Sequence, residues 1–148
     1  MINSIDTITK IKFPRHVADN GDLVVMEGVT HCPFSISRVF VVRGQKDNIR
    51  GQHAHKNCKQ LLVCSSGCIE IIANDGEKVK NILLDQPNVG LLVPPGIWLE
   101  QKYKENGTIL TVLCDLPYDS QDYIRDYKAF LDYINITLRS DVYMSEKK

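Results

Sequence analysis

Turn-forming residues interrupt this chain at short intervals, and no other feature limits its possible folds as strongly. Signals such as "SSG", "NDGE", "DQPN" and "KENG" separate short apolar or alternating segments. Turns roughly 8–12 residues apart indicate an antiparallel sandwich or barrel rather than alternating strand and helix units. The predicted strands are "LVVMEG" (23–28), "FSISRVFVV" (34–42), "QLLVC" (60–64), "CIEIIA" (68–73), "KVKNILL" (78–84), "VGLLV" (89–93), "IWLEQKY" (97–103) and "TILTVLC" (108–114).

The stretch "YDSQDYIRDYKAFLDYI" (118–134) departs from this pattern. Its large apolar side chains recur at helical spacing, at Tyr123, Tyr127, Phe130, Leu131 and Ile134. We expect a helix that is capped by Asp119 or Ser120 and packs on the barrel through this stripe. The polar tail "SDVYMSEKK" is expected to fray.

Composition narrows the class of protein. The chain has 148 residues, 43% of them hydrophobic and 24% charged, which suits one soluble globular domain. Lys plus Arg and Asp plus Glu are equal at 18 each, so we expect neither a nucleic-acid partner nor a membrane surface. No apolar run approaches a membrane span, and the N-terminus has no signal-peptide pattern. Five scattered cysteines without a CxxC motif indicate reduced thiols in a cytoplasmic protein.

The segment "RGQHAH" (50–55) contains two histidines, His53 and His55, which project to the same side of a strand. Such a pair begins many metal sites, but a metal needs three or four protein ligands. Downstream the chain offers Gln60, a neutral amide, and no histidine follows "PPG". The residues therefore favour acid–base chemistry without a metal, for which imidazole is suited near neutral pH.

Other residues are candidates for the walls of such a site. Arg38, Arg43 and Arg50 are candidate anion partners, because guanidinium binds phosphate in a forked geometry. Trp98 and Tyr103, with the "PPG" turn, are candidates for lining a pocket.

Four segments, "RGQHAHKNCKQLLVCSSG", "NDG", "LDQPNVGLLVPPGIW" and "YDSQDYIRDYKAFL", resemble the WxcM-like sugar-nucleotide 3,4-ketoisomerases of the cupin superfamily. The resemblance implies a single cupin domain over residues 1–148: an all-β double-stranded β-helix with a C-terminal helix. It implies a homodimer with exchanged N-terminal strands, and neither metal nor cofactor. The implied reaction converts dTDP-4-keto-6-deoxy-D-glucose to a dTDP-3-keto-6-deoxyhexose, which serves the biosynthesis of 3-amino sugars for surface glycans such as the O-antigen of lipopolysaccharide.

The resemblance also implies site residues. His53 and His55 correspond to the family's catalytic pair, with His55 expected to take the C3 proton and His53 to serve the oxygens, or the reverse. Arg50 and Arg43 are expected to bind the diphosphate, with Arg15 acting across the dimer. Trp98 is expected to stack on thymine.

One departure from the family pattern stands out. Members carry an active-site tyrosine in the strand before the histidines, where this chain has "RVFVV" with Phe40 and Val41. Tyr103 is our candidate for the missing hydroxyl. A non-catalytic sugar-nucleotide-binding cupin, a cupin epimerase and a metal cupin remain alternatives. The galacto or gluco configuration of the product at C4 stays open.

Overall fold

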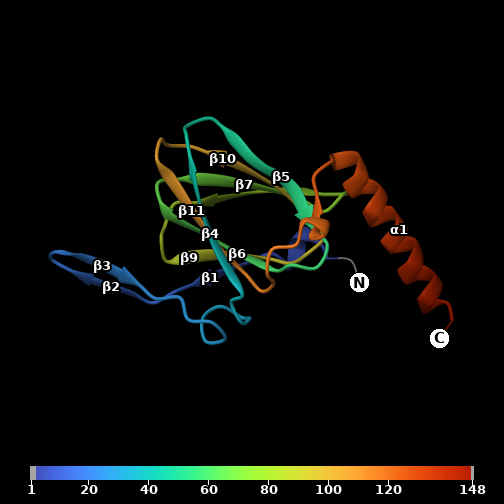
Figure 1. The fold of residues 1–148 in the computed structure, drawn as a ribbon, viewed down its shortest axis with the longest axis horizontal. Coiled ribbons are helices and arrows are strands. Elements are labelled where there is room, and N and C mark those ends of the chain that lie inside the picture. Colours follow the sequence, from blue (N-terminus) through green and yellow to red (C-terminus); the bar gives the residue numbers. More distant parts are fainter. Residues whose placement is uncertain (1–2, 148) are drawn as a thin grey trace.

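The computed structural model describes residues 3–147, and two five-stranded sheets face each other in it (Figure 1). The first sheet contains, in spatial order, β1 (Thr9–Lys12), β9 (Val89–Val93), β6 (Gln60–Ser66), β11 (Thr108–Cys114) and β4 (Arg38–Gly44). The second contains β12 (Tyr123–Ile124), β5 (Ile49–His55), β10 (Trp98–Tyr103), β7 (Ile69–Asn74) and β8 (Val79–Leu84). The N-terminal elements are η1 (Ile5–Thr7), β2 (Arg15–Ala18) and β3 (Gly21–Val24).

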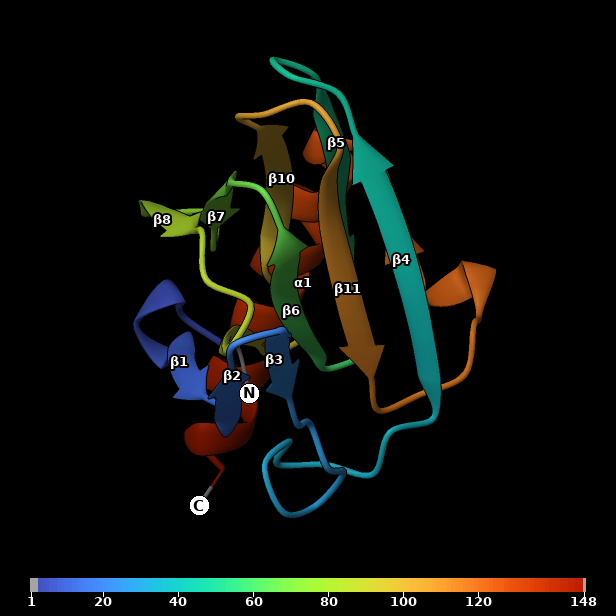
Figure 2. The ribbon, with the colours of Figure 1, turned by 90° about the vertical axis from the view of Figure 1, so that its left-hand side faces the viewer.

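Neighbours in each sheet are antiparallel and are often distant in sequence, as the position of β11 between β6 and β4 shows (Figure 2). Two facing sheets with such crossovers make a jelly roll. The predicted all-β jelly roll with a C-terminal helix is therefore confirmed. Two predicted strands are longer than observed: β4 begins at Arg38 and not at 34, and β3 ends at Val24 and not at 28.

The core lies between the two sheets and follows from strand alternation. In β7, Ile69, Ile71 and Ala73 are fully buried, while the side chains between them are partly exposed. Tyr103 also lies in this core with no exposed surface, and its ring occupies the space beside Gly44 where any Cβ would stand. A second apolar layer lies under the helix, on the outer face of the β5 and β10 sheet, and includes Trp98.

A β-bulge interrupts β5 next to the first histidine. Gly51 and Gln52 both have left-handed backbone angles, with φ of 81° and 55°. On β10, Leu99 pairs with His53 while the next residue, Glu100, pairs with Gly51, so Gln52 is the extra residue. Since side chains alternate along a strand, one extra residue reverses which face the residues before it occupy.

The β2–β3 hairpin projects from one side of the barrel, opposite the C-terminal helix (Figure 1). Its apolar side chains Val17 and Leu23 are exposed. The edge strand β4 also exposes Val39 and Val41 on its outer face.

The predicted helix begins later and ends later than the sequence spacing suggested. Residues Ser120–Asp122 form a 3-10 turn, η2, Tyr123–Ile124 form β12, and the helix α1 spans Tyr127–Ser145. Asp119 caps η2, whereas Asp126 caps α1 by accepting a hydrogen bond from the Ala129 amide at 2.9 Å.

The early start was wrong because the residues before Asp126 are held by β5 instead of by helical hydrogen bonds. The tail that we expected to fray forms the last turns of α1 as far as Ser145, and its final residue, Lys148, lies outside the described residues. Within residues 3–147, no helix combines the length and the apolar character needed to cross a membrane.

Candidate active site

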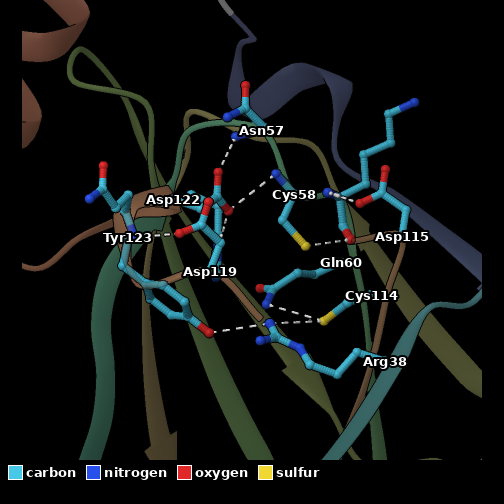
Figure 3. Close-up of polar contacts among 12 residues, drawn as sticks. Arg38, Asn57, Cys58, Gln60, Cys114, Asp115, Asp119, Asp122 and Tyr123 are labelled. Atoms are coloured by element: carbon cyan, nitrogen blue, oxygen red, sulfur yellow. Dashed lines mark hydrogen bonds and ion pairs between the residues drawn. The ribbon is translucent and has the colours of Figure 1, made fainter. Parts of the chain in front are cut away.

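His55 and Asp122 form a buried hydrogen-bonded pair at one end of the barrel. His55 ends β5, and its Nδ1 lies 2.8 Å from Asp122 Oδ2, with side-chain exposures of 5% and 8%. The carboxylate also accepts the backbone amides of Asn57 at 2.7 Å and Cys58 at 3.3 Å (Figure 3). Burial opposes ionisation of Asp122, but these hydrogen bonds outweigh it and lower its pKa. An ionised Asp122 fixes the proton of His55 on Nδ1 and leaves the Nε2 lone pair free.

His53 lies beside this pair with its ring edge-on to His55, the centroids 5.2 Å apart. Burial lowers the pKa of His53 to about 4 and also lowers that of His55, against the opposing effect of Asp122. Both imidazoles are therefore neutral at neutral pH. Two of their buried nitrogens, His53 Nδ1 and His55 Nε2, have no hydrogen-bond partner. Unpartnered buried polar atoms are costly and mark a place where a ligand can bind.

Tyr123 packs against both histidines. It stands opposite His55 in the β12–β5 ladder, with ring centroids 4.3 Å from His55 and 5.2 Å from His53. Its hydroxyl points toward Arg38, whose Nη2 donates to it at 3.2 Å (Figure 3). The guanidinium of Arg125 lies over the Tyr123 ring, 4.4 Å from its centroid.

Arg38 reaches this cluster from the opposite sheet. Its guanidinium also donates to Cys114 Sγ at 3.6 Å, and Gln60 donates to the same sulfur at 3.8 Å (Figure 3). Hydrogen bonds from Cys58 and Arg38 lower the pKa of Cys114, although burial opposes this. The Nε of Arg38 is buried without a partner, so this guanidinium retains a donor for a bound anion.

Arg50 shares the inner face of β5 with the histidines because of the bulge. Its β10 partner is Gln101, which is buried and alternates with the inward-facing Leu99 and Tyr103. In a regular strand, Arg50 would face away from His53. The predicted grouping of this arginine with the histidine pair thus has a structural basis, although its role remains a prediction.

Four other predicted site residues lie apart from the two histidines in this chain. Tyr103 is enclosed in the core, where its hydroxyl donates to Gln101 Oε1 at 3.2 Å. Trp98 lies on the outer face of the sheet, under α1. Arg43 is exposed and pairs with Ile109 on the outer face of β4. Arg15 lies on the projecting hairpin, bound to Asp22 at 2.6 Å.

Phe40 and Val41, where the resemblance led us to expect a tyrosine, face opposite sides of β4. Phe40 packs against the core from the inner face of β4, while Val41 is 62% exposed on the outer face.

The two histidines do not share a metal-binding arrangement. Within residues 3–147, the one group of potential ligands whose atoms all lie within 4.8 Å of one another is His55, Cys58 and Asp122. His53 is not part of this group, and the His55 and Asp122 atoms are already hydrogen-bonded to each other. A hydrogen bond with Cys114 and burial raise the pKa of Cys58, which keeps it as a neutral thiol. The donor set therefore suits a proton-transfer site.

The sequence analysis missed the functional position of Asp122 and Tyr123, because helical periodicity explained the segment that contains them. The signal that pointed to a site was the concentration of polar and aromatic residues in "YDSQDYIRDY", which belongs to the segments that carry the resemblance.

A family model described as "FdtA: WxcM-like, C-terminal" matches residues 6–135. A TDP-4-oxo-6-deoxy-alpha-D-glucose-3,4-oxoisomerase from Aneurinibacillus thermoaerophilus is 40% identical over 125 residues, which cover 84% of this chain and 90% of the relative.

Solved structures give the same result. A 3,4-ketoisomerase from Helicobacter canadensis is 35% identical and superimposes with a TM-score of 0.83, covering 87% of this chain and 98% of its own. QdtA, a sugar 3,4-ketoisomerase from Thermoanaerobacterium thermosaccharolyticum solved with TDP, is 34% identical with a TM-score of 0.86, covering 90% and 98%. A histidine-to-asparagine mutant of QdtA was solved with TDP-4-keto-6-deoxyglucose, at 34% identity, a TM-score of 0.84 and coverage of 88% and 96%.

Proposed function

The chain belongs to the FdtA family of WxcM-like proteins, and from this membership we propose that it isomerises dTDP-4-keto-6-deoxy-D-glucose to a dTDP-3-keto-6-deoxyhexose. The observation that carries the proposal is the buried His55–Asp122 pair, which presents an unpartnered Nε2 beside a second neutral histidine. Moving a carbonyl from C4 to C3 requires one base that is not consumed, donors for the developing oxyanion and the exclusion of water. The site offers these properties.

In the proposed mechanism, His55 Nε2 removes the proton on C3, which is acidic because it lies next to the C4 carbonyl. The C3–H electrons form the C3=C4 bond, and the C4 carbonyl electrons move to O4. The proton then returns from His55 to C4 as the C3=C4 electrons reach it, while the O3–H proton passes to O4 and the O3–H electrons form the C3 carbonyl, which completes the isomerisation. Asp122 holds the His55 ring and stabilises the imidazolium between these steps, while His53 donates a hydrogen bond to the substrate oxygens.

Arg50 is proposed to bind the diphosphate, because the bulge turns it to the face of β5 that carries the histidines. Arg43 and Trp98 lie on outer faces. Their proposed roles, Arg43 on the diphosphate and Trp98 stacked on thymine, therefore rest on the resemblance alone. Tyr103 has no exposed surface, so we propose for it only that its hydroxyl positions Gln101, the β10 partner of Arg50.

A homodimer is proposed from the exposed N-terminal hairpin. Val17 and Leu23 are 77% and 60% exposed on β2 and β3, and the edge strand β4 exposes Val39 and Val41. Exchange of the hairpin between two copies would cover apolar surface of this kind and carry Arg15 to the partner's site. Light scattering after size exclusion tests the dimer, and a monomeric mass at micromolar concentration contradicts it.

The proposed product is a 3-keto sugar nucleotide, which a transaminase would convert to a 3-amino sugar for surface glycans. A cytoplasmic location is proposed because all five cysteines are free thiols, four of them buried, a state suited to a reducing compartment.

Incubation with dTDP-4-keto-6-deoxyglucose in deuterated water, followed by NMR, tests the function. Carbonyl migration with loss of the C3 proton supports it, whereas deuterium incorporation without migration indicates an epimerase, and no exchange indicates a binding protein. His55→Asn should abolish turnover and leave dTDP affinity nearly unchanged. His31→Asn, outside the site, is the control; equal loss of binding and turnover in His55→Asn would make that residue a nucleotide anchor instead.

A further inference from the structure

Cys58 and Cys114 form a sulfur pair next to Asp122 that the proposed reaction does not use. Cys114 ends β11 and pairs with Gln60, and Cys58 lies two residues before Gln60 in the loop between β5 and β6. The two side chains are hydrogen-bonded to each other, and Cys58 Sγ is also 3.4 Å from the Lys59 carbonyl oxygen (Figure 3). Both residues are buried, with exposures of 3% and 0%. Two thiols in contact, one of them in a loop, have the arrangement from which a disulfide can form.

The surroundings of Cys114 favour the thiolate, which is the reactive form of cysteine. Three donors converge on its sulfur: the Arg38 guanidinium at 3.6 Å, the Gln60 amide at 3.8 Å and the Cys58 thiol. A sulfur that accepts several hydrogen bonds, one of them from a cation, holds negative charge at low cost. The pair therefore combines an attacking thiolate with a thiol beside it, which are the two components of disulfide formation.

The remaining cysteines do not have such surroundings. Cys32 and Cys64 are buried without a cation on the sulfur, and Cys64 Sγ is 3.4 Å from the Ser66 carbonyl oxygen. Among the cysteines, all of which lie within residues 3–147, Cys114 alone has a pKa below the usual value, while burial raises the pKa of Cys32, Cys64 and Cys68. Oxidation is therefore expected to begin at Cys114.

We propose that Cys58 and Cys114 form a modification site at which a peroxide oxidises the two sulfurs to a disulfide. The Cys114 thiolate attacks one peroxide oxygen, the O–O bond breaks and hydroxide leaves, which gives a sulfenic acid on Cys114. This hydroxide takes the Cys58 proton and becomes water. The Cys58 sulfur then attacks Cys114 Sγ, the S–O bond breaks, and a second hydroxide leaves as the S–S bond forms. Two electrons pass from the sulfurs to the peroxide, and no other reactant is needed.

The peroxide approaches Cys114 along the Arg38 side chain. Arg38 contacts the sulfur, yet it is partly exposed, and its guanidinium lies 5.4 Å from the ring of Tyr118, which is 62% exposed. The Nε of Arg38 is buried without a partner, so it can donate a hydrogen bond to a small polar molecule on this path. A rotamer change of this one side chain, which occurs within nanoseconds at partly exposed positions, opens the path to an oxidant little larger than water.

The disulfide would disturb the base of the proposed reaction. The Cys58 amide donates at 3.3 Å to Asp122 Oδ2, the atom that accepts from His55 Nδ1. An S–S bond of about 2 Å is shorter than any contact between two thiols, so its formation must shift the backbone that carries this amide. The effect on turnover rests on the proposed function, whereas the oxidation itself does not.

Peptide mapping by mass spectrometry tests the site in the full chain, after treatment with excess hydrogen peroxide and alkylation without reduction. The expected product is a pair of peptides linked through Cys58 and Cys114, which dithiothreitol separates. In Cys58→Ser, oxidation of Cys114 should stop at the sulfenic acid, which dimedone traps. Free Cys58 and Cys114 after the treatment, or a link confined to Cys64 and Cys68, overturns the proposal.

Cys68→Ser is the matched control, because Cys68 lies in the turn between β6 and β7 and is the most accessible of the described cysteines. It should form the same disulfide at the wild-type rate. Oxidation of the wild type should reduce turnover roughly 10- to 100-fold, as expected for a displaced base, and dithiothreitol should restore it. Unchanged turnover in fully oxidised protein overturns the coupling to Asp122. Reduced protein that forms the disulfide but never isomerises the substrate refutes the parent function instead, so the two failures are distinguishable.

Discussion

Replacing Asp122 by asparagine isolates the contribution of one charge to the site. In the wild type, Oδ2 accepts from His55 Nδ1 and the Cys58 amide, and Oδ1 accepts from the Asn57 amide. Asparagine has one oxygen for these positions, so its Nδ2 must face either the Asn57 amide or the His55 and Cys58 side. In the second orientation, His55 is forced to carry its proton on Nε2, where it no longer acts as a base.

The substitution should affect both catalysis, through the tautomer of His55, and stability, through a buried amide left without an acceptor. Loss of the correct tautomer should reduce kcat roughly 1000-fold, which corresponds to about 4 kcal/mol of transition-state stabilisation. A buried donor left without an acceptor should lower the free energy of unfolding by about 1–3 kcal/mol, or Tm by roughly 3–10 °C for a domain of this size. dTDP affinity should change little, because the carboxylate faces His55 and the backbone.

The assay combines NMR-monitored turnover, thermal unfolding and calorimetry with dTDP on Asp122→Asn and Asp119→Asn. Asp119 is three residues earlier and caps η2 through the Gln121 amide, a role that asparagine fills equally well. This control should keep both activity and stability. A kcat within about threefold of wild type in folded Asp122→Asn would refute the role of the His55–Asp122 pair as the base.

Further predictions concern pH, packing and substrate affinity. The lowered pKa of His53, about 4, means that the unfolded chain binds a proton below its usual pKa of 6.5 that the folded chain excludes. Urea unfolding should therefore show a smaller free energy of unfolding at pH 5 than at pH 7, with a loss of up to about 1.4 kcal/mol for each unit by which the pH is lowered. His53→Gln should reduce this dependence of stability on pH. Gly44→Ala should lower the free energy of unfolding by about 1–3 kcal/mol, measured by urea titration, because its Cβ overlaps the Tyr103 ring. Arg50→Ala should weaken dTDP binding in calorimetry roughly 10- to 100-fold, and unchanged affinity would remove Arg50 from the site.

Most strands were predictable because their signal is local. The alternation in β7 and the turns that flank it depend only on neighbouring residues and on one face being buried. The start of α1 was not predictable in this way. Residues 118–126 satisfy helical spacing, but Asp122 gains more from His55 and two backbone amides than from a helical turn. Tertiary contacts decided that boundary.

The histidine pair was visible in the sequence, while its environment was not. Spacing correctly predicted that His53 and His55 lie side by side on a strand, as their ring contact shows. The same rule places Arg50 on the opposite face, and only the bulge at Gln52 brings it back. A bulge depends on the partner strand, so alternation within a single strand does not reveal it.

The site also depends on the short strand β12 and on Asp122, which precedes it; both come late in the chain. Asp122 and Tyr123 reach His55 across 67 residues of sequence or more, and β12 joins β5 through only two paired residues. So short a pairing is a natural place for local opening, without unfolding of the barrel. Each opening would separate the base from its carboxylate and its phenol together. Amide hydrogen exchange at Tyr123 and Ile124 would then measure the fraction of folded molecules that are switched off at any instant.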